Sequence, residues 1–252
     1  AGFEAIIVKG KSPDPVYLWI QDGEVEIRSA KHMWGQKTAE VQESIRTELD
    51  DQRVRVLQIG PAGENLSRVA CLIHDASNAA GQGGFGAVFG SKNLKAISVI
   101  GTGHIKINDP KALLATRLWH KENYAFGLAH LKVNSSSYQF QRPPIPLALW
   151  AQGRPQIGQR PQACMGCHSG CRARYKDALG NEASCFTSVF YWDARSLDIQ
   201  RLASDLINRY GLNAVDMCWG LRYIHMLQQR GQLKTASIPE CPLDFSAYGS
   251  QE

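Results

Sequence analysis

Ala79-Ala-Gly-Gln-Gly-Gly-Phe-Gly-Ala-Val-Phe-Gly90, followed by Ser91-Lys-Asn-Leu-Lys-Ala-Ile97, is the stretch of sequence that decides the fold of this chain. Glycine lets the backbone adopt positive φ and approach a ligand closely, and consecutive N–H groups in such a loop can hold a phosphate. The same composition suits a tight turn packed beneath a strand, and the spacing matches neither a P-loop nor a dinucleotide fingerprint. Both a ligand cradle and a packing turn therefore stay open.

The residues around this stretch predict a mixed α/β segment over 1–103. Residues 5–8 are expected to form a short buried strand, and Asp22-Gly23 between two β-rich runs predicts a hairpin. The other expected elements are a helix from Thr38 with apolar residues at Val41, Ile45 and Leu49, a strand over 54–59 ending in a turn at 60–63, and a strand over 96–100.

The pattern becomes helical after residue 103, where we expect a domain boundary. Asp109 and Pro110 open a helix as N-cap and first residue. A helical stripe over 199–207 ends at Gly211, and Asn213 caps a helix that starts at Ala214. The fold class is therefore α+β: a mixed α/β segment, 1–103, followed by a mostly helical domain, 104–252.

Three cysteines lie within eight residues, in Cys164-Met-Gly-Cys167-His-Ser-Gly-Cys171. The spacing fits three thiolates of an iron–sulfur cluster, a Cys3His zinc site with His168, or, in its first five residues, the haem-attachment pattern C-x-x-C-H. Burial of three reduced thiols as small apolar residues is a fourth reading, which their density disfavours. Haem attachment needs export, and His168 directly beside Cys167 would strain a shared tetrahedral site.

Composition bounds the class of protein. The chain has 252 residues, of which 44% are hydrophobic, and a net charge of +5 with the two signs interspersed. Nucleic acid is therefore not an expected partner. No apolar run approaches the roughly 20 residues of a membrane span, and no signal peptide is apparent, so a cytoplasmic location is expected.

Three blocks together resemble the tungsten- or molybdenum-containing aldehyde:ferredoxin oxidoreductase family. The glycine stretch at 79–97, with Ile59-Gly-Pro-Ala-Gly-Glu-Asn-Leu66 before it, is similar to the family's signature, and 1–11 with 32–35 fit its run-up. The cysteine run resembles the family's cluster site. Asn208-Arg-Tyr-Gly-Leu-Asn213 resembles its first pterin motif, although its spacing alone is better explained as an ordinary helix–helix turn.

The resemblance implies two pterins holding one tungsten or molybdenum atom, with Mg²⁺ as a candidate ion at the pterin phosphates, beside a [4Fe–4S] cluster. It implies that electrons pass to ferredoxin or a partner iron–sulfur subunit, in an oxygen-sensitive homo-oligomer. Residues 1–103 would be half of the pterin-binding base domain. The implied cofactor-binding residues are Asn78, Ala79, Gly81, Gln82, Asn208, Leu212 and Asn213, and the implied cluster ligands are Cys164, Cys167 and Cys171.

The chain also departs from the family pattern. Asn78 and Gln82 stand where arginine is common, and asparagines replace the usual acids of the pterin motif. Glu182 is the remaining acid of a stretch that is glutamate-rich in many members, which makes it the candidate catalytic residue. No E-x-x-H pattern matches the mononuclear iron site that some members have.

The length of the chain points to a fragment. Members of the family are about twice as long, so the fourth cluster thiolate is expected on the remainder of the enzyme, with Cys185, Cys218 and Cys241 as weaker candidates. The leading hypothesis is part of a bispterin oxidoreductase acting on an aldehyde or related carbonyl compound. The alternative is a non-catalytic zinc or iron–sulfur electron-transfer module.

Overall fold

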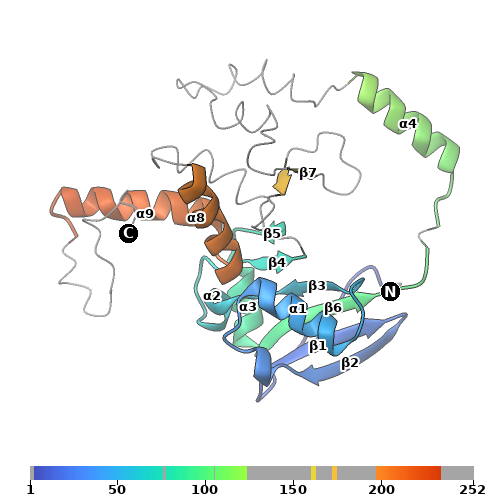
Figure 1. Ribbon diagram of the computed structural model, residues 1–252, viewed down its shortest axis with the longest axis horizontal. Coiled ribbons are helices and arrows are strands. Elements are labelled where there is room, and N and C mark those ends of the chain that lie inside the picture. Colours follow the sequence, from blue (N-terminus) through green and yellow to red (C-terminus); the bar gives the residue numbers. More distant parts are fainter. Residues whose placement is uncertain are drawn as a thin grey trace.

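A computed structural model describes residues 3–75, 78–104, 106–123, 160–162, 172–174 and 197–233 (Figure 1). The elements, in chain order, are β1 Val16–Gln21, β2 Glu24–Ser29, the 3-10 helix η1 Lys31–Met33, α1 Thr38–Glu48, β3 Arg55–Gln58, α2 Pro61–Glu64, β4 Leu72–His74, β5 Asn78–Ala80, α3 Phe85–Ser91, β6 Leu94–Ile100, α4 Pro110–Asn123, β7 Arg160–Gln162, β8 Arg172–Arg174, α8 Leu197–Tyr210 and α9 Ala214–Gln229. Among these helices, none has the length and apolar character needed to cross a membrane.

The predicted hairpin at Asp22-Gly23 is confirmed. β1 and β2 pair antiparallel, with Gln21 opposite Glu24. The two turn residues have φ values of 45° and 99°, and positive φ at both positions gives the backbone twist that a two-residue hairpin needs.

Six strands form one mixed sheet in the order β2-β1-β6-β3-β4-β5. The β1–β6 pair is parallel, and the other pairs are antiparallel. Successive residues of β1 point to opposite faces: Tyr17 and Trp19 pack with Val41 and Ile45 of α1, whereas Leu18 and Ile20 pack on the other face, where Phe89 of α3 contacts the cluster.

The strand expected over 5–8 is wrong. These residues form no strand, and the side chains of Ile6 and Ile7 are 46% and 82% exposed. Only Val8 contacts the apolar cluster on the second face of the sheet. β1 is already paired on both sides, by β2 and β6, so this segment has no place beside it.

The turn expected over 60–63 is a single turn of helix, α2. Pro61 is its first residue, where the missing N–H costs nothing and the fixed φ favours the helix. Helices are confirmed from Thr38, from Pro110 and from Ala214. Every side chain of α4 for which burial is described is exposed.

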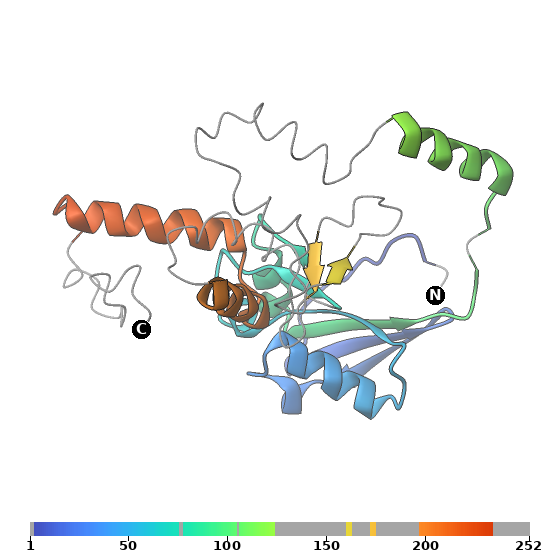
Figure 2. The same ribbon diagram turned by 45° about the horizontal axis from the view of Figure 1, so that its top comes forward.

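The helices α8 and α9 lie at the end of the sheet formed by β4 and β5 (Figures 1 and 2). Gly211 ends α8 with a φ of 73°, and Asn213 caps α9, as expected. The α+β fold class is confirmed. The division into domains near residue 103 stays a prediction.

Candidate functional site

The glycine loop connects β5 to α3. Gln82, Gly83 and Gly84 all have positive φ, at 59°, 73° and 68°. Residues 80–83 are exposed, and α3 begins at Phe85. Three successive left-handed residues turn the chain sharply, and the backbone at Gln82 and Gly83 lies at the surface, where it can approach a ligand.

Several glycines of the stretch are required by packing. A Cβ on Gly84 would lie 2.8 Å from the carbonyl oxygen of Arg68, and one on Gly86 would lie 2.8 Å from Cβ of Ala70. A Cβ on Gly90 would overlap the carbonyl of Gly63 in α2. These three glycines allow close packing of backbone, which confirms the packing turn for this part of the stretch. The ligand cradle stays a prediction.

The turn between α8 and α9 has a regular local geometry. The amide of Leu212 donates to the carbonyl of Ile207 (2.9 Å), and that of Gly211 donates to the carbonyl of Asn208 (3.1 Å). This pair of bonds, with Gly211 left-handed, is the Schellman motif. Leu212 also packs against Ile207, the apolar contact that accompanies the motif.

The cap of α9 follows directly. The side-chain oxygen of Asn213 accepts from the amide of Val215 (3.1 Å), and its amide nitrogen donates to Asp216 (2.7 Å). Asn208 and Asn213 are almost completely buried, with exposed fractions of 1% and 5%. Both residues therefore shape the turn from inside the protein.

The turn is docked on the segment just before β4. Asn213 donates its amide hydrogen to the carbonyl of Val69 (2.8 Å), and Cys71 donates to the carbonyl of Gly211 (2.8 Å). An isolated antiparallel bridge joins Ala70 to Leu212 between them. The motif near residue 210 is thus fixed beside the base of the glycine loop.

Two glycines permit this close approach. A Cβ on Gly60 would lie 2.5 Å from the carbonyl carbon of Tyr210, so only glycine fits beneath the turn. A Cβ on Gly81 would lie 3.2 Å from the side-chain oxygen of Asn213. The structure therefore brings Gly81, Leu212 and Asn213 together, with Asn78 and Ala79 in the half-buried strand that leads to them.

This arrangement suits an anionic group. The N-terminus of α9 carries the positive end of a helix dipole, and the neighbouring loop exposes backbone groups in a left-handed run. The phosphates of a pterin cofactor are such groups. Asp216 adds one negative charge in the first turn of α9, but its contact with Asn213 directs it to the cap.

The cysteine stretch is framed by a hairpin. β7 and β8 pair antiparallel with Gln162 opposite Arg172, so these two residues, which flank segment 163–171, lie about 5 Å apart. Cys164, Cys167 and Cys171, and the candidate catalytic Glu182, lie outside the described residues. In the part of the chain that the structure describes, no group of three or more His, Cys, Asp or Glu residues could hold a metal ion.

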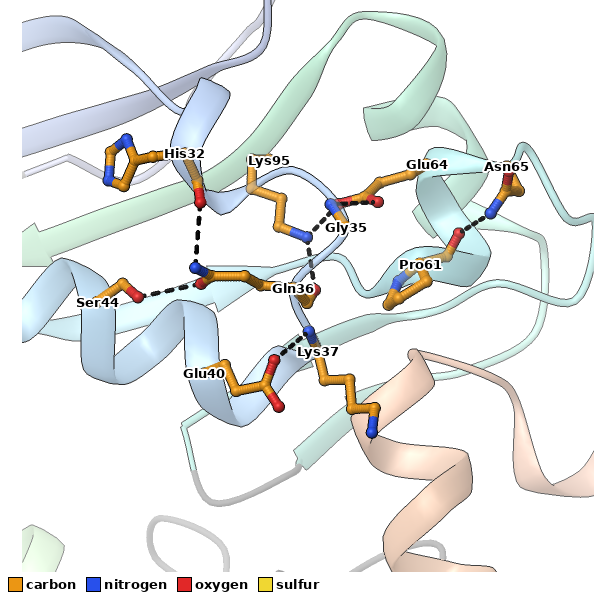
Figure 3. A network of polar contacts seen from close by, with 10 residues as sticks. All are labelled: His32, Gly35, Gln36, Lys37, Glu40, Ser44, Pro61, Glu64, Asn65 and Lys95. Carbon is orange, nitrogen blue, oxygen red and sulfur yellow. Dashed lines mark hydrogen bonds and ion pairs between the residues drawn. The ribbon is translucent and has the colours of Figure 1, made fainter.

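A buried ion pair between Lys95 and Glu64 was not foreseen from the sequence (Figure 3). The Lys95 side chain has no exposed surface and that of Glu64 is 5% exposed. Burial lowers the pKa of Lys95, and the Glu64 carboxylate opposes that shift. The two residues lie 31 positions apart in the chain, and neither position carries a local pattern that signals the pairing.

The geometry defines an α+β unit in which a glycine loop is closed by a helix N-terminus from a later segment. Residues 1–101 match the family described as aldehyde ferredoxin oxidoreductase, N-terminal domain. The tungsten-containing aldehyde ferredoxin oxidoreductase of Pyrococcus furiosus is 34% identical over 271 residues, covering 96% of this chain and 44% of the relative. The chain therefore spans less than half the length of this relative.

Two further comparisons extend the likeness. The WOR-like subunit of aliphatic sulfonate oxidoreductase from Pyrococcus furiosus is 38% identical over 41% of this chain and 18% of that protein. Among solved structures, the active-site complex BamBC of benzoyl coenzyme A reductase, in complex with 1,5-dienoyl-CoA, has a TM-score of 0.73 and 26% identity. It covers 94% of this chain and 42% of that chain. The chain belongs to the aldehyde ferredoxin oxidoreductase family.

Proposed function

We propose that the protein is an oxidoreductase whose metal–pterin cofactor is held partly by the Gly81 loop and the turn at 208–213. The observation that supports this most directly is the position of Gly81 against Asn213, since a Cβ there would come within 3.2 Å of the side-chain oxygen. Two segments far apart in sequence meet at an open backbone loop and a helix N-terminus, and both resemble pterin-binding elements of the family.

The residues in this site would orient the cofactor and its phosphates. The left-handed run Gln82 to Gly84 would offer backbone groups, and Gln82 with Asn78 would offer uncharged hydrogen-bonding side chains where relatives often carry arginine. The bound tungsten or molybdenum centre would supply the two-electron redox chemistry. Mg²⁺ as a counter-ion at the pterin phosphates belongs to the same proposal.

Cys164, Cys167 and Cys171 would give three ligands to a [4Fe–4S] cluster, with the fourth thiolate on the rest of the protein. The β7–β8 pairing supports this role because it brings together the residues on either side of the cysteine segment. Electrons would leave through the cluster to ferredoxin or to an iron–sulfur subunit. We place the protein in the cytoplasm as a homo-oligomer.

An aldehyde or related carbonyl compound is the proposed substrate class, with Glu182 as the candidate catalytic acid. The names of the relatives cover an aldehyde, an aliphatic sulfonate and a benzoyl thioester. Assays on the full-length protein should therefore compare these three classes with one artificial electron acceptor and one donor. A preference for the sulfonate or the thioester would overturn the proposed substrate and leave the cofactor proposal standing.

The test of the cofactor site is elemental analysis of the full-length protein after anaerobic purification, with pterin fluorescence of the released cofactor. We expect tungsten or molybdenum together with pterin. Gly81→Val should lower both severalfold, because its side chain would fill the space beside Asn213. Gly103→Val is the matched control, since a Cβ there meets nothing within 4 Å among the described residues. Absence of both metals from the wild-type protein would sink the proposal.

The cluster is tested by iron content and by its visible absorption. Cys167→Ser should remove most of the iron, whereas Cys185→Ser and Cys241→Ser should leave it unchanged. The hairpin around the cysteines also favours a second candidate, a non-catalytic zinc module, because short hairpins present zinc ligands in ribbons and knuckles. One tightly held zinc per chain, without iron or pterin, would decide for that candidate.

A further inference from the structure

The segment that joins η1 to α1, residues 34–37, is held by polar contacts from α2 and from β6. Both carboxylate oxygens of Glu64 accept from the amide of Gly35, at 3.0 and 2.8 Å. Lys95, which is paired with Glu64, also donates to the carbonyl oxygen of Gln36 at 2.9 Å (Figure 3). A buried charge pair with these additional partners fixes the backbone of the segment at two successive residues.

Further polar groups of the segment are bound as well. The side-chain amide of Gln36 donates to the carbonyl of His32 (3.1 Å) and accepts from the hydroxyl of Ser44 (3.0 Å). The amide of Lys37 donates to Glu40 in the first turn of α1 (3.1 Å). Figure 3 shows these contacts converging on Gln36 from η1, from α1 and from the sheet. These contacts therefore fix the backbone that leads into Thr38, the first residue of α1.

The residue that follows is Thr38, and it reaches the second half of the cofactor site. Its hydroxyl donates to the carbonyl oxygen of Asn208 at 3.0 Å, in a buried bond between residues 170 positions apart. That same oxygen accepts from Gly211 within the Schellman turn. Lys37 supports the contact, with its ammonium 5.2 Å from the centre of the Tyr210 ring.

The turn consequently has two anchors. Residues 69–71 bind it at Gly211 and Asn213, and Thr38 binds it at Asn208. Loss of either anchor would remove one of these two sets of hydrogen bonds from the turn. Two anchors fix the angle between the end of α8 and the start of α9, and so fix where Asn213 lies relative to Gly81.

We infer that Thr38 is a positioning residue of the proposed cofactor site and that its hydroxyl holds the 208–213 turn against the glycine loop. The Lys95–Glu64 pair fixes the backbone that precedes Thr38. This inference rests on the proposed function for its consequence in cofactor binding. The claim that Thr38 and residues 69–71 both hold the turn does not depend on the cofactor. Thr38→Val removes the hydroxyl and keeps the buried shape, whereas Thr38→Ser keeps the hydroxyl.

The first measurement is amide hydrogen exchange of the full-length protein without added cofactor. In Thr38→Val, exchange at Gly211 and Leu212 should rise about fivefold, the effect of one lost hydrogen bond of typical strength. Exchange in Leu18 and Ile97 of the central strands should stay unchanged. Thr38→Ser should behave as the wild type. Unchanged exchange at 211–212, or an equal rise in the central strands, would overturn the inference.

The second measurement is the metal and pterin content of the same variants after anaerobic purification. Thr38→Val should retain severalfold less than the wild type, and Thr38→Ser should recover the wild-type level. Equal retention in wild type and Thr38→Val overturns the positioning role while leaving the proposed function intact. A wild-type protein without pterin defeats the proposed function instead, and the exchange experiment then still decides whether Thr38 anchors the turn.

Discussion

Gly90 of α3 and Gly63 of α2 are in backbone contact, so close that a Cβ on Gly90 would overlap the carbonyl group of Gly63. This contact joins the helix that follows the glycine loop to the helix that carries Glu64. The glycine-rich stretch thus combines two physical roles, an open loop at its start and a close helix–helix contact at its end.

Gly90→Ala should destabilise the protein by about 3 kcal/mol or more, the upper part of the range for overpacked sites. Urea unfolding of the full-length protein measures this change. Gly220→Ala, inside α9, is the matched control because its Cβ meets nothing within 4 Å among the described residues. That substitution should stabilise the helix by about 0.5–1 kcal/mol. Similar effects at the two positions would contradict the packing argument.

Tyr17→Phe should change how stability depends on pH in alkaline solution. Tyr17 is fully buried and its hydroxyl donates to Glu48 at 2.7 Å. Burial, and then this carboxylate, raise the pKa of Tyr17 from 10.0 to about 12. The folded state holds the phenol proton more tightly than the unfolded chain does, so this stabilisation is complete below pH 10.0 and is lost towards pH 12.

The loss amounts to about 3 kcal/mol across that interval. It should appear as a falling urea midpoint in the wild type between those pH values. The Tyr17→Phe protein should be less stable than the wild type by about 1 kcal/mol at neutral pH, because it lacks the hydrogen bond. Its stability should fall less between neutral and alkaline pH. Parallel pH curves for the two proteins would show that Tyr17 does not titrate as described.

Glu64→Gln should cost about 3–5 kcal/mol, because it leaves the buried Lys95 ammonium without its counter-charge. Lys95→Met removes that charge, so adding it to Glu64→Gln should recover part of the loss. A double-mutant cycle in urea should give a coupling of about 0.5–3 kcal/mol. Additive effects of the two substitutions would mean that the pair is not coupled.

Gln58→Met should stabilise the protein by about 1 kcal/mol. Gln58 has no exposed surface, and neither atom of its amide has a hydrogen-bond partner among the described residues. Replacing an unpaired buried amide with an apolar chain of similar size removes its desolvation penalty. A destabilisation of similar size would instead indicate an internal water molecule bound to the amide.

Local signals in the sequence predicted much of the fold. Asp22-Gly23 fixed the hairpin because a two-residue turn with positive φ needs such residues, and Gly211 with Asn213 marked the α8–α9 turn for a similar reason. Residues 5–8 were wrongly expected to form a strand. A short apolar run predicts a buried strand only if the fold places it beside a strand and beneath other side chains, and here Ile6 and Ile7 are exposed and residues 5–8 pair with no strand.

The candidate site was predictable only in its parts. The glycine stretch and the 208–213 turn were each identifiable, but their meeting at Gly81 and Asn213 depends on pairing between residues 69–71 and the turn. Thr38 gave no signal as part of the site. A threonine at the start of a helix is common, and its partner is a backbone carbonyl, which leaves no trace in side-chain identity.

The separation of 170 residues between Thr38 and Asn208 has a consequence for how the protein is made. All six strands of the sheet lie before residue 101, so the sheet can form while the later helices are still being synthesised. At roughly 5–20 residues per second, the ribosome needs on the order of ten seconds to reach the turn. During that interval the glycine loop lacks its contact with the 208–213 turn, and the proposed cofactor site is completed only when that turn has been synthesised.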